Sequence, residues 1–145
     1  MKHPILFSTC AVVVSIVAAA AGQDAAPRSA WDGVYTTEQA GRGARLADQH
    51  CIACHGDRLT GGELAPALTG EVFTATWDGV MLSDLFDRIR TTMPLDNPGT
   101  LSRQQSVELL AYVLSIGKFP AGDAPLVTDA GVLGQIKFQS IRPQR

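Results

Sequence analysis

The residues of this chain best suited to chemistry stand together in the run Cys51-Ile52-Ala53-Cys54-His55. Two thiols three positions apart, followed at once by an imidazole, make up the attachment signal of a c-type haem. In such a site both sulfurs bond covalently to one porphyrin, and the histidine becomes the proximal ligand of the iron. The run therefore predicts a single haem c, attached through Cys51 and Cys54, with His55 on the iron.

Three other kinds of site use a Cys-x-x-Cys pair, and the sequence argues against each of them. A zinc site needs two further ligands, yet no Cys or His follows the run; the remaining ones are His3, Cys10 and His50. A thioredoxin-like pair belongs to a βαβ unit, whereas the segments around Cys51 indicate helix and loop. A disulfide between cysteines three apart would close a small, strained ring and connect no distant segments.

The start of the chain has the features of a secretory signal. Lys2 supplies a positive charge, residues 4–21 carry none, and small residues that suit a signal peptidase follow. The apolar run is short for a membrane span, so we expect residues 1–22 to be removed; an uncleaved anchor is the alternative. Cys10 would leave with this segment. The mature chain would then hold only the two haem thiols, as suits an oxidising compartment.

Charge and composition narrow the classes of function. The formal net charge is −2, and loss of Lys2 with the signal would make it −3. Such a weak charge does not indicate nucleic acid as a partner. The length of 145 residues suits one domain. Two Trp, two Tyr and five Phe would give a thin core, to which a buried porphyrin would add apolar volume.

Helices must place these residues, and the first is predicted over residues 38–49. Thr36 and Gln39 have the spacing of a capping box at its start. Its stripe of small side chains consists of Ala40, Gly43, Ala44 and Ala47. Because glycine costs about 1 kcal/mol in a helix interior, Gly43 indicates close approach of another helix; a weakly formed helix is the alternative.

Two further helices are predicted after a loop over residues 56–70. One covers residues 82–91, has an apolar face, and ends before Pro94. The other begins after Ser102 as N-cap and stops at Gly117. Its apolar arc is wide, which indicates burial on more than one side. No strand-like alternation is found along the sequence.

Strings of residues along the chain resemble those of the class I c-type cytochromes, over about residues 35–120. The closer resemblance is to bacterial periplasmic cytochromes and cytochrome domains associated with pyrroloquinoline-quinone alcohol dehydrogenases. The strings that carry it are Val34-Tyr35-Thr36, Gln39-Ala40, Arg42-Gly43, Cys51 to Gly56, Ala65-Pro66-Ala67-Leu68, Arg90 to Pro94, Pro98-Gly99, Leu101-Ser102, Ala111-Tyr112 and Phe119-Pro120-Ala121-Gly122. The resemblance implies an all-α, small class I cytochrome c-like helical fold wrapped around one covalently bound haem.

The chain would accordingly divide into four parts. We expect a cleaved signal peptide at residues 1–22, a flexible lead-in at 23–34, the cytochrome c domain at 35–120, and a C-terminal tail at 121–145. The tail carries a candidate short helix after Asp129. Packing of the tail on its own domain is the simpler interpretation, and binding of a partner is the alternative.

Three residues outside the signal are candidates for the sixth iron ligand: Met93, Met81 and His50. The resemblance implies Met93, which follows His55 in a loop ahead of the last helix and is stiffened by Pro94. Met81 precedes an amphipathic helix, where a core role is the simpler interpretation. His50 adjoins the attachment edge and is expected in solvent. Ligation by His55 and Met93 would raise the reduction potential and favour electron transfer.

Further haem contacts are implied by the resemblance. The carbonyl of Pro66 would accept a hydrogen bond from Nδ1 of His55, and Leu68 would press on the porphyrin; an ordinary loop is the alternative. Trp77 and Arg90 are candidates for bonds to the haem propionates. A core position for Trp77 and a solvated helix face for Arg90 are the alternatives.

One position departs from the family pattern. Where an aromatic residue usually follows the helix-crossing glycine, this chain has Ala47, while the partner aromatic is present as Tyr112. We therefore expect a thinner crossing, or one in which Tyr112 fills the space alone.

The function expected is a periplasmic, monohaem c-type cytochrome that carries single electrons and is not itself an enzyme. Its partners would be redox proteins: a donor dehydrogenase and an acceptor oxidase or other cytochrome, without nucleic acid or a stable membrane span after signal cleavage. The alternative is the haem-bearing subunit of a quinoprotein dehydrogenase acting on alcohols or sugars. A third possibility, a ligand-binding sensor or peroxidase, requires Met93 to be off the iron.

Overall fold

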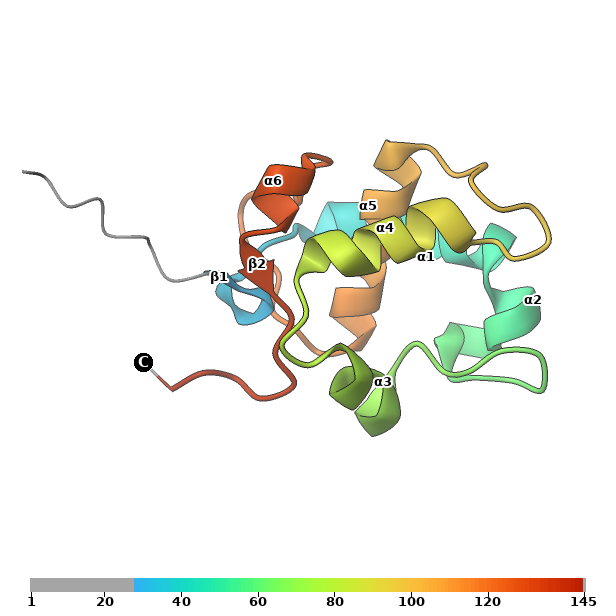
Figure 1. The fold of residues 1–145 in the computed structure, drawn as a ribbon, viewed down its shortest axis with the longest axis horizontal. Helices are drawn as coiled ribbons and strands as arrows, with labels where there is room; N and C mark the ends of the chain where they lie inside the picture. Colours follow the sequence, from blue (N-terminus) through green and yellow to red (C-terminus); the bar gives the residue numbers. More distant parts are fainter. Residues whose placement is uncertain (1–27, 145) are drawn as a thin grey trace, which may run out of the picture.

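The computed structural model describes residues 28–144, and its ribbon is shown in Figure 1. The expected signal peptide, Cys10 and the first residues of the lead-in lie outside the described residues. In order, the elements are β1 (Arg28–Ser29), η1 (Ala30–Asp32), α1 (Thr37–His50), α2 (Ile52–His55), η2 (Asp57–Leu59), α3 (Gly70–Trp77), α4 (Leu82–Thr92), α5 (Arg103–Ile116), α6 (Ala130–Leu133) and β2 (Ile136–Lys137). The described chain is mostly helical, which confirms the predicted all-α fold.

Helices α1 and α5 cross closely, and Gly43 is the reason that they can. A Cβ atom at this position would collide with the backbone carbonyl of Glu108 and with the Cβ of Tyr112. The crossing is reinforced by Arg42, whose Nε lies 2.6 Å from Oε1 of Glu108. Gly43 lowers the intrinsic stability of helix α1 but lets α5 pack closely against it, as the sequence predicted.

The missing aromatic residue on α1 leaves the crossing thin. Ala47 is fully buried, whereas Tyr112 is only half-buried. An open hollow of about 280 Å³ lies nearer the start of α1, where Ala40, Gly41 and Ala44 line it together with Tyr112; Ala47 is not part of its lining.

The helix ends follow local capping chemistry. The hydroxyl of Ser102 accepts from the backbone N–H of Gln105, and the Gln105 side chain accepts from the N–H of Ser102, so this capping box is complete. At α1 only half of the expected box forms. Thr36 accepts from the N–H of Gln39, but the Gln39 amide exchanges two hydrogen bonds of 2.8 Å with the backbone of Leu126. The Gln39 side chain therefore bonds to the distant Leu126 backbone instead of to the backbone N–H of Thr36.

Helix α4 packs against α5 through an apolar face. Leu82, Leu85 and Phe86 are at most 4% exposed, and the guanidinium of Arg103 lies 5.2 Å from the ring centroid of Phe86. None of the helices in the described residues is both long and apolar enough to cross a membrane.

The residues that follow α5, 117–144, fold back and pack against the helical part of the chain. They include α6, which contacts α4, and β2, which pairs in parallel with β1 at the end of the molecule opposite α2 (Figure 1). The sequence showed neither this strand pair nor α3. A strand of two residues is too short to show an alternation of polar and apolar side chains. Helix α3 is short, follows a glycine-rich loop and lacks a marked apolar stripe. The expected division into domain and tail stays a prediction.

Candidate haem site

The haem-attachment run forms one turn of helix that presents its histidine inward. In α2, His55 is 7% exposed, and its Nδ1 lies 2.7 Å from the backbone oxygen of Pro66. Because a carbonyl can only accept, Nδ1 must carry the proton and donate it. The lone pair is then on Nε2, which is the atom an iron ion would bind.

A tight loop brings Pro66 to this histidine. The backbone oxygen of His55 accepts from the N–H of Gly61 at 2.7 Å, and the N–H of Leu68 donates to the oxygen of Leu59 at 2.9 Å. Gly56 starts the loop with φ +76, and a Cβ there would collide with the carbonyl of Gly61. Glycine is therefore needed directly after the histidine.

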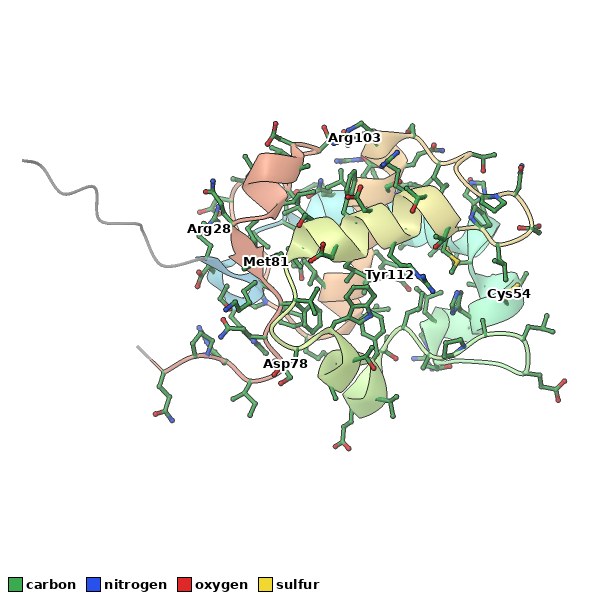
Figure 2. All side chains as sticks on the ribbon, viewed as in Figure 1. Arg28, Cys54, Asp78, Met81, Arg103 and Tyr112 are labelled. Atoms are coloured by element: carbon green, nitrogen blue, oxygen red, sulfur yellow. The ribbon has the colours of Figure 1, made fainter. Side chains whose placement is uncertain are left out.

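The two cysteines are free thiols in different surroundings. Cys51 is half-buried, whereas Cys54 is exposed and lies at the α2 end of the molecule (Figure 2). Burial, and secondarily the charge of Cys54, raises the pKa of Cys51 to about 11.

The three candidates for the sixth ligand lie in different places. Met93 is half-buried and follows the C-terminal end of α4, the end directed toward α2 (Figure 1). Met81 precedes the other end of this 11-residue helix, about 16 Å away, and pairs with Lys137 in an antiparallel bridge. His50 is exposed at the end of α1. The arrangement favours Met93.

The other predicted contacts fall into two groups. Leu68 and Trp77 are half-buried against the core, and the Trp77 ring lies 6.2 Å from that of Phe73. Arg90 lies at the surface, where its Nη2 is 3.4 Å from Oδ1 of Asp87. The structure thus places Arg90 in an exposed ion pair, and its role toward a propionate stays a prediction.

The residues around His55 fit a haem. The donor set is an inward imidazole with its Nε2 available, two free thiols on one helical turn, and a thioether following α4. Leu68, Trp77 and Tyr112 come from three separate segments and are apolar yet only half-buried. Such a set of incompletely covered apolar side chains is what a porphyrin would bury.

One residue near this region, Phe73 of α3, was not singled out from the sequence, although its ring lies 6.2 Å from that of Trp77. Tyr112, expected at the helix crossing, lies between α5 and the α3 side of the molecule (Figure 2). The four-residue spacing of Phe73 and Trp77 was the signal that could have revealed α3, because such a pair lies on one helix face.

Residues 38–113 match the sequence model of the family described as "Cytochrome C oxidase, cbb3-type, subunit III". Among solved structures, the sulfane dehydrogenase SoxCD from Paracoccus pantotrophus is 23% identical with a TM-score of 0.48, over 66% of this chain and 56% of that chain. This chain therefore spans little more than half the length of that one. No curated protein matches the sequence.

Proposed function

The chain belongs to the cytochrome c family, as a class I c-type cytochrome matching the cbb3-type subunit III domain, and on this premise we propose that it carries single electrons in the bacterial periplasm. One haem c would be attached through Cys51 and Cys54, and His55 and Met93 would be the residues that hold its iron. The observation that carries the proposal is the 2.7 Å contact between Nδ1 of His55 and the Pro66 carbonyl within the attachment run. That contact orients the ring and makes Nε2 a better donor.

The haem, when bound, supplies a one-electron Fe(III)/Fe(II) couple at a potential set by its ligands and its burial. The chain's residues do the rest. His55 and Met93 would hold the iron from the protein and keep a substrate from binding to it, which would favour electron transfer over chemistry on a bound molecule. The export signal expected at residues 1–22 supports the periplasmic location.

Electrons would enter and leave at the α2 end of the molecule. Cys54 is exposed there, and the adjoining segments present Ile52, Leu64 and Leu95, which are 37%, 79% and 76% exposed. These three residues, hereafter the apolar edge, would give a redox partner apolar contacts beside exposed charged residues of both signs, such as Glu63, Asp96 and Arg58. A short-lived contact of this kind suits a carrier that must bind and release.

A haem subunit of a quinoprotein dehydrogenase is the alternative, which the resemblance of the strings at Met93-Pro94 and at Phe119 to Gly122 suggests. In the structure Phe119 and Gly122 serve the fold: the Tyr35 hydroxyl donates to the oxygen of Phe119 and the N–H of Gly122 donates to the oxygen of Tyr35, both at 2.7 Å. They therefore give no specific support for a dehydrogenase partner. Co-purification of a dehydrogenase with the tagged cytochrome would favour the alternative.

Paired methionine variants test the proposal. Met93→Ala should remove the Fe–S(Met) signature from the spectrum, lower the reduction potential and allow rapid CO binding. The matched control is Met81→Ala at the opposite end of α4, which should change none of the three. A Met93→Ala spectrum identical with that of the wild type would contradict the proposal and favour a haem sensor or peroxidase.

A further inference from the structure

The residues that follow α5 lie beyond the family match at 38–113, yet they are packed like a core. Four apolar side chains between residues 121 and 144 are at most 4% exposed; they are Leu126, Leu133, Ile136 and Phe138. This segment, hereafter the strap, is therefore a fixed part of the described structure. What it holds in place follows from its hydrogen bonds and ring contacts.

The strap is hydrogen-bonded to the connection between α3 and α4. The N–H of Phe138 donates to the oxygen of Val80, and the oxygen of Phe138 accepts from the N–H of Gly79, both at 2.8 Å. The N–H of Ser140 donates to Oδ1 of Asp78 at 2.6 Å. Three consecutive residues of the connection are thus tied to one short stretch of the strap.

The ring of Phe138 extends this hold to α3 itself. It meets Phe73 of α3 edge-on at 6.1 Å between centroids, and its centroid lies 4.9 Å from that of Phe119. Within residues 28–144, α3 does not pack extensively against another helix, as α1 does against α5 and α4 does against α5. Val72 on its outer side is 81% exposed. The contact from Phe138 is therefore a principal support of this helix.

We propose that Phe138 is a positioning residue, which holds α3 and its Trp77 against the haem and thereby sets the reduction potential. The proposal rests on the proposed function, since it requires a haem beside α3. Trp77 is one of the half-buried apolar residues that a porphyrin would cover. Exclusion of water favours the less charged, reduced haem, so a firmly seated α3 raises the potential.

The test compares two buried strap residues in the holoprotein. Phe138→Ala should lower the equilibrium constant for reduction at least threefold, which is about 28 mV for a one-electron couple. It should also speed amide hydrogen exchange of α3 at least tenfold. The matched control is Leu133→Ala, a fully buried residue of α6, which contacts α4 instead. It should lower stability without either effect. Phe138→Leu should give a smaller shift of the same sign, and it decides the question if Phe138→Ala does not fold.

The outcomes separate this proposal from the proposed function. Wild-type potential and α3 exchange in the Phe138 variants, or equal shifts in Leu133→Ala, would overturn the role of Phe138 while leaving the electron carrier intact. A wild-type spectrum without the Fe–S(Met) signature would instead contradict the proposed function. Exchange of the α3 amides would still decide whether Phe138 holds the helix.

Discussion

The two ends of this molecule are built on different principles. At the end of β1, β2 and α6, side chains of the protein pack against one another. Phe138 and Ile136 are 1% exposed, and backbone hydrogen bonds connect the strap to the neighbouring segments. Both ends expose single apolar side chains, Leu64 and Leu95 at the α2 end and Ile141 at the strap end, but the two thiols of the described residues, Cys51 and Cys54, lie at the α2 end. The difference supports the proposal that a haem covers the α2 end, whereas the strap end is packed by the chain's own buried side chains.

The largest effect should come from removing the covalent anchors. The double variant Cys51→Ala, Cys54→Ala should lose all covalently attached haem, because no other thiol remains outside the signal segment. The loss should raise hydrogen exchange in the loop 56–69 far more than in α5. Mass spectrometry of the denatured protein and amide exchange would check this.

Ile52→Ala, between the two cysteines, is the control for that experiment and should keep the haem. Equal loss of protection in the loop 56–69 and α5 after haem removal would contradict the contrast between the two ends.

The next largest effect is expected at the crossing of α1 and α5, which lies between the two ends (Figure 1). Gly43→Ala should destabilise the holoprotein by about 2–3 kcal/mol, because the added methyl group collides with backbone. Gly41→Ala, in the same helix with nothing within 4 Å of its added Cβ, should instead stabilise it by about 0.5–1 kcal/mol. Denaturant unfolding measures both, and a similar sign for the two variants would refute close approach at Gly43.

A smaller, pH-dependent effect is expected at Glu108 on the same crossing. Burial alone would raise the pKa of this carboxyl, but hydrogen bonds from Arg42 and Gln104 outweigh it and hold the pKa below 4.5. The stability it contributes is therefore present above about pH 4.5 and lost as the pH falls through the lowered pKa.

Glu108→Gln should cost about 1–2 kcal/mol at pH 7 and reduce the loss of stability between pH 5 and pH 3. Unfolding curves across that range provide the measurement. Glu38→Gln, at an exposed position of α1, is the control. An unchanged acid dependence in Glu108→Gln would show that the ion pair does not stabilise the crossing.

The smallest effect should appear at the apolar edge. Leu64→Ser together with Leu95→Ser should slow electron exchange with a redox partner by about threefold to tenfold, because the partner would no longer bury two leucine side chains. Stability and reduction potential should stay unchanged. Ile141→Ser, at an equally exposed residue of the strap end, should leave the rate as it is. Stopped-flow kinetics with a cytochrome partner would distinguish the two surfaces.

The parts of the fold that the sequence predicted are those with local causes. Capping by Ser102, the stop at Gly117 and the apolar stripe of α4 act over a few residues, so their helices were located to within about two residues. Gly43 indicated a helix crossing because a glycine in a helix interior needs a compensating contact.

The missed parts depend on contacts between distant residues. The pairing of β1 with β2, the bonds from Gln39 to Leu126 and the packing of Phe138 on α3 leave no periodic pattern in the sequence. At the site, the attachment run is a covalent signal with fixed spacing. The roles expected of Met93, Leu68, Trp77 and Arg90 depend on a haem and stay predictions.

The spectrum of the purified holoprotein tests most directly whether His55 and Met93 both ligate the haem iron. The visible and near-infrared spectrum of the oxidised protein should show the Fe–S(Met) signature, and the reduced protein should bind CO only slowly. A spectrum without that signature, together with rapid CO binding, would contradict the account.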